Sequence, residues 1–313
     1  MMGSGIAGFS DPDEFKAALV EAGITEYLVI GRGQFRARMI SLALPHVRLS
    51  SVEEWLPRIA VVSPPPAIIR IVLPTGRSAC AVYGGRKVEA GEIVTHFGAP
   101  AVHERLSGPC RWSDILLPAS YVARYGRVLA GAAFSVPSGL HGWRPSPKAL
   151  AQLRTLHAAA MRITEARRGL EAGAEAARGL EQQLTGGVIE CLSGDGPEPE
   201  TRASRRHTEM MARLERLIEA HLNRKFPMAE ICQTLEISHR TLHACCKAHL
   251  GMSPSYYLYV RRMQLARRAL RRADPAETTV SGVARRYGFG EPGRFAVLYR
   301  AQFGELPSTT LKG

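Results

Sequence analysis

The sequence predicts an α+β protein: a β-rich N-terminal domain, of cupin-like or sandwich type and with helices, followed by an all-α C-terminal domain. Three observations predict this class. Short apolar runs separated by Gly and Pro fill the first half of the chain. From about Pro147, apolar residues recur every three or four positions, which is typical of helices. A residue pattern then recurs at an offset of 53 positions, which indicates two helix-turn-helix modules joined by a long helix.

The β-rich domain is assigned to residues 1–145. It is expected to begin with one helix over residues 11–22, because Phe15, Leu19 and Ala22 share one side and Gly23 is a stop signal. Short strands separated by Gly and Pro are typical of an antiparallel sandwich or barrel. The predicted strands include 27–30, 35–42, 59–62, 68–73, 80–83 and 92–97.

Residues 146–192 are expected to form helices for dimerisation or packing. A first helical face carries the apolar positions Leu150, Leu153, Leu156, Ala160 and Ile163. A second stripe combines leucines with small residues, which allows close helix pairing, so a homodimer contact and packing within one chain both remain open. Its members are Leu170, Ala174, Ala177, Leu180, Leu184 and Val188. A linker over 193–203 follows, since 193–200 has no side chain suited to a core.

Positive charge is concentrated at the C-terminal end. The net charge is +13, and residues 201–313 hold 20 Lys and Arg against 9 Asp and Glu. A domain this basic favours a polyanionic partner such as nucleic acid, with a merely soluble basic surface as the alternative. The chain has no apolar run long enough to span a membrane and no signal peptide, which predicts a cytoplasmic, nucleoid-associated protein without membrane contact.

The C-terminal domain is assigned to residues 204–313. Pro227 is expected to begin a short helix that ends near Leu235, and Ser238 to cap a second helix that Gly251 ends. Ser253 and Pro254 then begin a helix to about Arg272, roughly 30 Å long. This length is close to the roughly 34 Å between successive major-groove faces of DNA. The repeat returns Ala248, Gly251, Pro254, Ser255 and Leu258 as Ala301, Gly304, Pro307, Ser308 and Leu311.

Residues from about 206 to 311 resemble the DNA-binding domain of the AraC family of bacterial regulators. The resemblance rests on Ile231, residues 238–242 and 250–254 in the first module, and on Val283-Ala284, residues 287–289 and Phe303-Gly304 in the second. It implies double-stranded DNA and RNA polymerase as partners, activation more than repression, and an N-terminal domain that senses a small-molecule effector or dimerises. No residue is assigned to an effector, and no cofactor is expected.

Side chains on the outward face of each recognition helix are the candidate DNA contacts. Arginine pairs with guanine, histidine bonds to base edges, and small apolar groups meet thymine methyls, whereas lysine and hydroxyl groups bind phosphates. Candidate base contacts are His239, Arg240, His243, Ala244, Arg294 and Val297. Candidate phosphate contacts are Ser238, Lys247, Arg261 and Arg300. Because few polar side chains occupy the second helix, the first module is expected to supply most base specificity.

Other features of the chain leave alternatives open. His96, His103 and Glu104 suggest a metal site, but structural histidines are the stronger interpretation, and no metal is assigned. The adjacent Cys245 and Cys246 point about 100° apart on a helix, which favours buried packing over chelation. An alkyl-transfer enzyme fused to a DNA-binding tail would need a metal-held cysteine cluster, and Cys80 and Cys110 stand alone. A non-specific architectural DNA-binding protein is the third alternative, and no enzyme is predicted.

Overall fold

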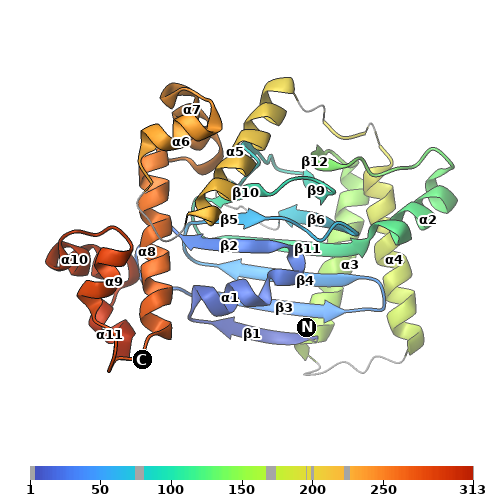
Figure 1. Cartoon of the computed structure of the whole chain (residues 1–313). Coiled ribbons are helices and arrows are strands. Elements are labelled where there is room, and N and C mark those ends of the chain that lie inside the picture. The colour runs from blue at the N-terminus through green and yellow to red at the C-terminus, as the bar shows by residue number, and fades with distance from the viewer. Residues whose placement is uncertain are drawn as a thin grey trace.

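The α+β class is confirmed by the computed structural model, which describes residues 4–74, 81–166, 174–194, 196–198, 201–221 and 226–312. Figure 1 shows a β-sandwich at the centre of the molecule, with helices α2, α3 and α4 on one side. The helical C-terminal third covers the other side. Its long helix α8 carries one group of short helices near each end.

Two antiparallel sheets form the sandwich. The larger has the strand order β1-β3-β4-β11-β6-β9-β12. Its strands are Gly5–Phe9, Ala37–Ala43, Arg48–Glu54, Cys110–Pro118, Ile68–Pro74, Ile93–Phe97 and Gly139–Trp143. The smaller sheet has the order β2-β5-β10-β7-β8, with strands Ile24–Val29, Arg58–Val62, Val102–Leu106, Ala81–Tyr83 and Arg86–Lys87. The predicted segments 27–30, 35–42, 59–62, 68–73 and 92–97 all overlap strands, and residues 75–80 lie outside the described part of the chain.

The single helix predicted over residues 11–22 is wrong in extent. Helix α1 spans Pro12–Ala18, and a separate 3₁₀ turn spans Val20–Ala22. Asp11 caps α1 by accepting hydrogen bonds from the backbone nitrogens of Asp13 and Glu14 at 2.9 and 3.1 Å. Two buried side chains, Phe15 and Leu19, still face the sandwich. The apolar residues of this segment therefore lie on a short α-helix and a 3₁₀ turn instead of one helix. Gly23 follows the turn in the left-handed region at φ 83°.

Strand β6 shows how the larger sheet is buried on both faces. Ile69, Ile71 and Leu73 pack towards the helices, while Arg70 and Val72 face the sandwich interior. Alternate residues of a strand point to opposite faces, so burial on both sides favours an apolar run, which Arg70 interrupts in β6. The covering helices are α2 (Ala119–Ala130), α3 (Pro147–Ala166) and α4 (Ala174–Leu192).

The small-residue stripe of residues 170–188 is partly used within this chain. Leu184 and Val188 are buried in the core that α3 and α4 share with the sheet, whereas Ala174 is exposed. Leu170 lies outside the described residues. The C-terminal part of the stripe therefore packs within the chain.

Two of the three tryptophans, Trp112 and Trp143, are core residues at 1% and 3% exposure.

A network of buried charges lies between the two sheets. Arg58 bonds to Glu54 and Glu104, each at 3.3 Å, and Arg70 pairs with Glu104 and with Asp114 at 3.0 Å. Tyr27 and Trp112 donate hydrogen bonds to Glu54. Burial works against both arginine cations, but the surrounding carboxylates raise the pKa of Arg58 and of Arg70 above its ordinary value. Both cations are therefore held charged inside the sandwich.

The C-terminal helices rest on the outer face of the smaller sheet. Helix α5, Arg202–Ala220, packs with the first helix-turn-helix module into one apolar core. Leu28 of β2 and Ile59 of β5 belong to that same core. The N-terminal domain thus completes the packing of the first module.

Candidate nucleic-acid interface

The first helix-turn-helix module consists of α6, Met228–Leu235, and α7, His239–Leu250. Glu236 adopts a left-handed conformation at φ 57° and ends α6. Ser238 Oγ accepts a hydrogen bond from the Thr241 backbone nitrogen at 3.1 Å, which is the expected cap of α7. Gly251, at φ 72°, ends that helix.

Helix α7 separates an inner face from an outer one. Leu242, Cys245, Cys246 and Leu250 are fully buried, so the packing role expected for the cysteines is what the structure shows. His249 is also buried, and burial lowers its pKa to about 3, which keeps the ring neutral. The proposed DNA contacts share the exposed side: Ser238, His239, Arg240, His243, Ala244 and Lys247.

Helix α8, Pro254–Arg272, joins the two modules as one continuous rod. Ser253 caps it by accepting a hydrogen bond from the Tyr256 backbone nitrogen at 3.2 Å. Its 19 residues correspond to about 28 Å. The length expected from the sequence, close to one turn of DNA, is therefore present.

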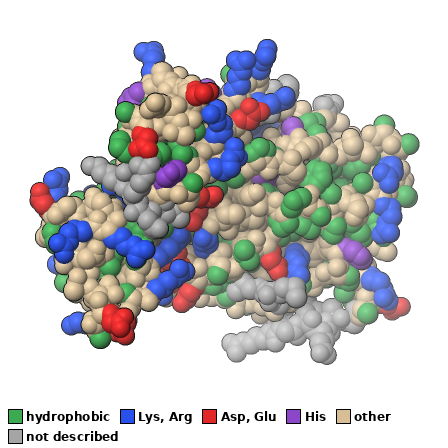
Figure 2. Space-filling view, viewed as in Figure 1, with side chains coloured by type: hydrophobic (Ala, Val, Ile, Leu, Met, Phe, Trp, Pro, Cys, Tyr) green, Lys and Arg blue, Asp and Glu red, His purple; other side chains and the backbone are tan. Residues whose placement is uncertain are grey.

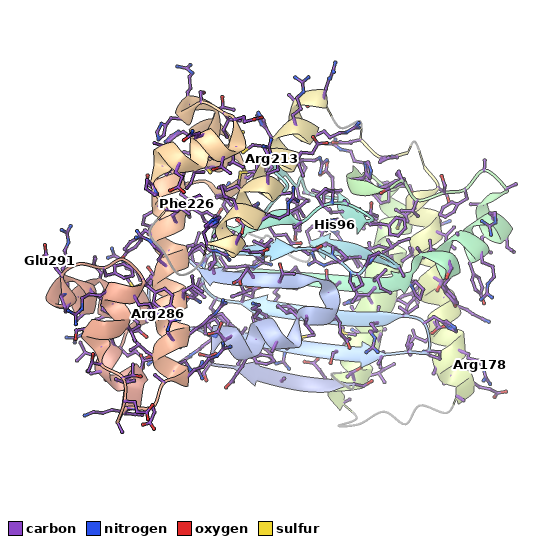
Figure 3. All side chains as sticks on the ribbon, viewed as in Figure 1. His96, Arg178, Arg213, Phe226, Arg286 and Glu291 are labelled. Carbon is purple, nitrogen blue, oxygen red and sulfur yellow. The ribbon has the colours of Figure 1, made fainter. Side chains whose placement is uncertain are left out.

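The second module consists of α9 (Val280–Arg286), α10 (Pro292–Phe303) and α11 (Pro307–Lys312). Helix α10 begins 53 positions after α7, which agrees with the sequence repeat. Phe295 and Tyr299 are buried, while Arg294, Arg300 and Val297, at 70% exposure, lie on the outside. Figure 3 shows Glu291, which precedes α10, at the outer edge of this module.

Comparison with known proteins supports the assignment of the C-terminal third as a helix-turn-helix domain. A family model described as "Helix-turn-helix domain" matches residues 231–313. A probable thc operon regulatory protein of Rhodococcus erythropolis is 39% identical over 95 residues, which are 30% of this chain and 29% of that protein. XylDLEGF operon transcriptional activator 1 of Pseudomonas putida is 34% identical over 100 residues, 32% of this chain and 30% of that protein. The chain thus spans less than a third of the length of these two relatives.

The C-terminal third is an AraC-type DNA-binding domain. The transcriptional activator RhaS of Salmonella dublin is similar over a longer stretch, with 31% identity over 172 residues, 55% of this chain and 57% of that protein. Among solved structures, the AraC-like activator CuxR is 14% identical, with 83% of this chain and 93% of that one covered and a TM-score of 0.43. A probable AraC family regulator from Rhodopseudomonas palustris is 33% identical over 33% of this chain and 95% of its own, with a TM-score of 0.31.

Basic side chains gather over the AraC-type domain. Figure 2 shows Lys and Arg side chains over both modules on this face of the molecule, beside a mainly uncharged surface on the sandwich.

No helix in the described part of the chain is long and apolar enough to cross a membrane.

The position of Arg261 differs from the prediction that it contacts phosphate. Its side chain is only 4% exposed and lies 3.3 Å from Glu26 and 3.4 Å from Glu215. Three further arginines of α8 also face the N-terminal domain. Arg267 binds Asp11 at 2.9 Å, Arg268 binds Asp13 at 2.6 Å and Glu26 at 3.0 Å, and Arg271 binds Asp11. We call these four arginines and their carboxylate partners the α8 seam.

The sequence does not reveal the α8 seam, because Asp11, Asp13 and Glu26 lie about 250 residues away from the arginines. From the sequence alone, Arg261 is expected to contact phosphate. In the structure, the four arginines instead attach the connecting helix to β2 and to the start of α1. In this arrangement Arg261 is not free for DNA, because two carboxylates hold it in a buried position.

The stabilisation that the α8 seam provides is expected to depend on pH. Burial opposes ionisation of Asp11 and Glu26, but the arginines lower the pKa of each carboxyl below its ordinary value, 3.8 and 4.5 respectively. A depressed folded-state pKa stabilises the fold above the ordinary value and ceases to do so as the pH falls through the folded value. The melting temperature of an Asp11→Asn/Glu26→Gln variant should therefore be lower than that of the wild type by about 4 °C at pH 7.

This difference in melting temperature should shrink as the pH falls below the ordinary pKa values of these carboxyls and through their lowered folded-state values. Asparagine still caps α1, so loss of the cap does not complicate the comparison. Glu53→Gln, which alters the exposed pair with Arg111, is the control and should change little at any pH. A difference that stays constant from pH 7 to pH 3 would contradict the assignment of these carboxylates to the seam.

The residues of the suspected metal site do not form one. Glu104 is committed to Arg58 and Arg70, whereas His103 points out of the sandwich and bonds to Glu215 at 2.8 Å. His96 lies inside the sandwich (Figure 3), where burial and the nearby Arg70 lower its pKa to about 4. Within the described ranges, no three His, Cys, Asp or Glu side chains are grouped to hold a metal ion.

Proposed function

We propose that this protein is a sequence-specific, DNA-binding transcription regulator whose two modules read successive major grooves. The observation that carries the proposal is the pair of exposed recognition helices at the two ends of one rigid helix of about one DNA turn. The proposed base contacts are His239, Arg240, His243, Ala244, Arg294 and Val297, and the proposed phosphate contacts are Ser238, Lys247 and Arg300. Relatives named as transcriptional activators support regulation of transcription, with activation as the proposed sign and RNA polymerase as a partner.

The four-part division of the chain at 145, 192 and 203 remains part of the proposal. In this division, residues 1–145 respond to a small-molecule effector. Residues 146–192 form the helical layer that packs on the larger sheet, or they contribute to a homodimer. A cytoplasmic location follows from the proposed DNA partner. The protein is proposed to act without catalysis and without a cofactor.

Binding to DNA from upstream of its own and neighbouring genes tests the function. The purified full chain is titrated against labelled fragments in excess random competitor DNA, across a salt series. Retention of one fragment under competition supports a sequence-specific regulator. Equal displacement from every fragment at every salt concentration would instead support the architectural alternative, in which charge alone sets affinity.

The salt dependence of binding provides a separate prediction for the phosphate contacts. Lys247→Ala and Arg300→Ala should each lower affinity similarly on all fragments and reduce the slope of log K against log salt by about one, since each cation displaces one counterion. Lys148→Ala is the control, because this exposed lysine lies on α3, across the sandwich from the modules. Unchanged slopes for both module variants would remove these residues from the phosphate interface.

A further inference from the structure

Strand β10 contacts different parts of the molecule with its two faces. It lies in the middle of the smaller sheet, between β5 and β7. Since successive side chains of a strand alternate, Glu104 points into the sandwich and its neighbours His103 and Arg105 point outward. The outward face is the one on which the AraC-type domain rests.

On the inner face, Glu104 is the centre of the buried charge network. Its carboxylate binds Arg58 at 3.3 Å and also pairs with Arg70. The two arginines connect it to Glu54 and to Asp114 on the larger sheet. Glu104 is therefore the residue through which β10 joins this charge network.

On the outer face, His103 takes part in a fully buried hydrogen-bond cluster. Its Nε2 lies 2.8 Å from Glu215 Oε1 on α5, and Tyr257 of α8 donates to the same oxygen at 2.6 Å. Burial opposes the charge of Glu215, but Arg261 and the hydrogen bonds from His103 and Tyr257 lower its pKa to about 2. The carboxylate can therefore only accept, so the Nε2 of His103 carries the donated proton.

The C-terminal end of the first recognition helix α7 rests on the same strand. The ring of His249 packs edge-on to His103, with ring centroids 6.5 Å apart. It also lies against Gly85, where an added Cβ would be 2.7 Å from its Nε2. Gly251 ends α7, and a Cβ added to it would lie 2.3 Å from Nη1 of Arg105. The recognition helix and β10 are therefore in close contact.

We propose that β10 positions the first recognition helix, with His103 and Arg105 as positioning residues, and that it transmits rearrangements around Glu104 to α7. Neighbouring residues of a strand share one stiff backbone, and packed interfaces shift as units instead of deforming continuously. A displacement of Glu104 within the sandwich therefore moves the outward side chains that seat α7. The inference deepens the proposed function, because it rests on α7 being a DNA-reading helix.

Hydrogen–deuterium exchange of the free full-length protein tests the proposal with two matched pairs of variants. His103→Leu is compared with His157→Leu. Both histidines are buried, but His157 lies on α3, on the other side of the sandwich from α7, and bonds to the backbone carbonyl of Ser50. Glu104→Gln is compared with Asp114→Asn, since both carboxylates pair with Arg70 but only Glu104 is on β10. Circular dichroism confirms that each variant is folded.

We expect His103→Leu to accelerate exchange in α7 by about tenfold, since a hydrogen bond to a charged group is lost. Glu104→Gln should accelerate it by about threefold, although the Glu104 side chain points into the sandwich and away from α7. His157→Leu and Asp114→Asn should leave α7 unchanged, and His103→Gln, which retains a donor at the position of Nε2, should restore slow exchange. Equal exchange in α7 across either pair would overturn the proposal. Because DNA is absent, this outcome is distinct from a failure of selective DNA binding.

Discussion

Replacing Arg58 by leucine is expected to lower the free energy of unfolding by about 3–5 kcal/mol. The guanidinium is fully buried and lies between Glu54 and Glu104, both of which are also buried. Removing one partner of a buried ion pair leaves an uncompensated charge in a medium of low polarity, and this cost exceeds the loss of the contact itself. Chemical denaturation monitored by tryptophan fluorescence gives the value, since Trp112 lies beside Arg58.

Arg111→Leu is the matched control for this experiment. Arg111 bonds to Glu53 at 2.8 Å, but its side chain is 67% exposed, so the same substitution should cost about 0–1 kcal/mol. Equal losses of stability in the two variants would show that the charges between the sheets do not hold the sandwich together.

Replacing Arg240 by alanine is expected to reduce the preference for the selected DNA fragment over random DNA by about 10- to 100-fold. This estimate corresponds to the loss of one bidentate contact with a base. Arg240 is exposed on the first recognition helix beside His243 and Ala244. The second recognition helix has fewer polar groups, and Glu291 directly precedes it. Arg294→Ala should therefore reduce this preference much less than Arg240→Ala does.

Competition binding at fixed salt measures both preferences. Arg213→Ala is the control, because this exposed residue lies on α5, outside both recognition helices (Figure 3). Equal relaxation of preference by Arg240→Ala and Arg294→Ala would mean that the two modules share the reading, contrary to the asymmetric arrangement proposed here.

The C-terminal domain could be predicted from the sequence because its signals are local. Ser238, Gly251 and Ser253 lie at helix boundaries and act on neighbouring backbone groups, so the sequence indicates where α7 and α8 begin and where α7 ends. The outward and inward faces of α7 also follow from helical periodicity alone. The positions of the two recognition helices therefore follow from the sequence without reference to tertiary contacts.

The N-terminal domain was harder to predict because its charged residues are paired over long distances. Strands β10 and β11 contain His103, Glu104 and Asp114, which interrupt the alternation that marks a strand. Their burial becomes favourable only when Arg58 and Arg70 meet them across the sandwich. For the same reason the α8 seam was not foreseen, since Glu26 and Arg268 approach each other only after folding.

Footprinting of the bound DNA fragment tests the central claim most directly. If the modules at the two ends of α8 read successive major grooves, the full chain should protect two patches on one face of the duplex, centred about 10–10.5 base pairs apart. Arg240→Ala should weaken protection in one patch more than in the other. A single protected patch, or uniform protection along the fragment, would contradict a two-module reader held at a fixed spacing.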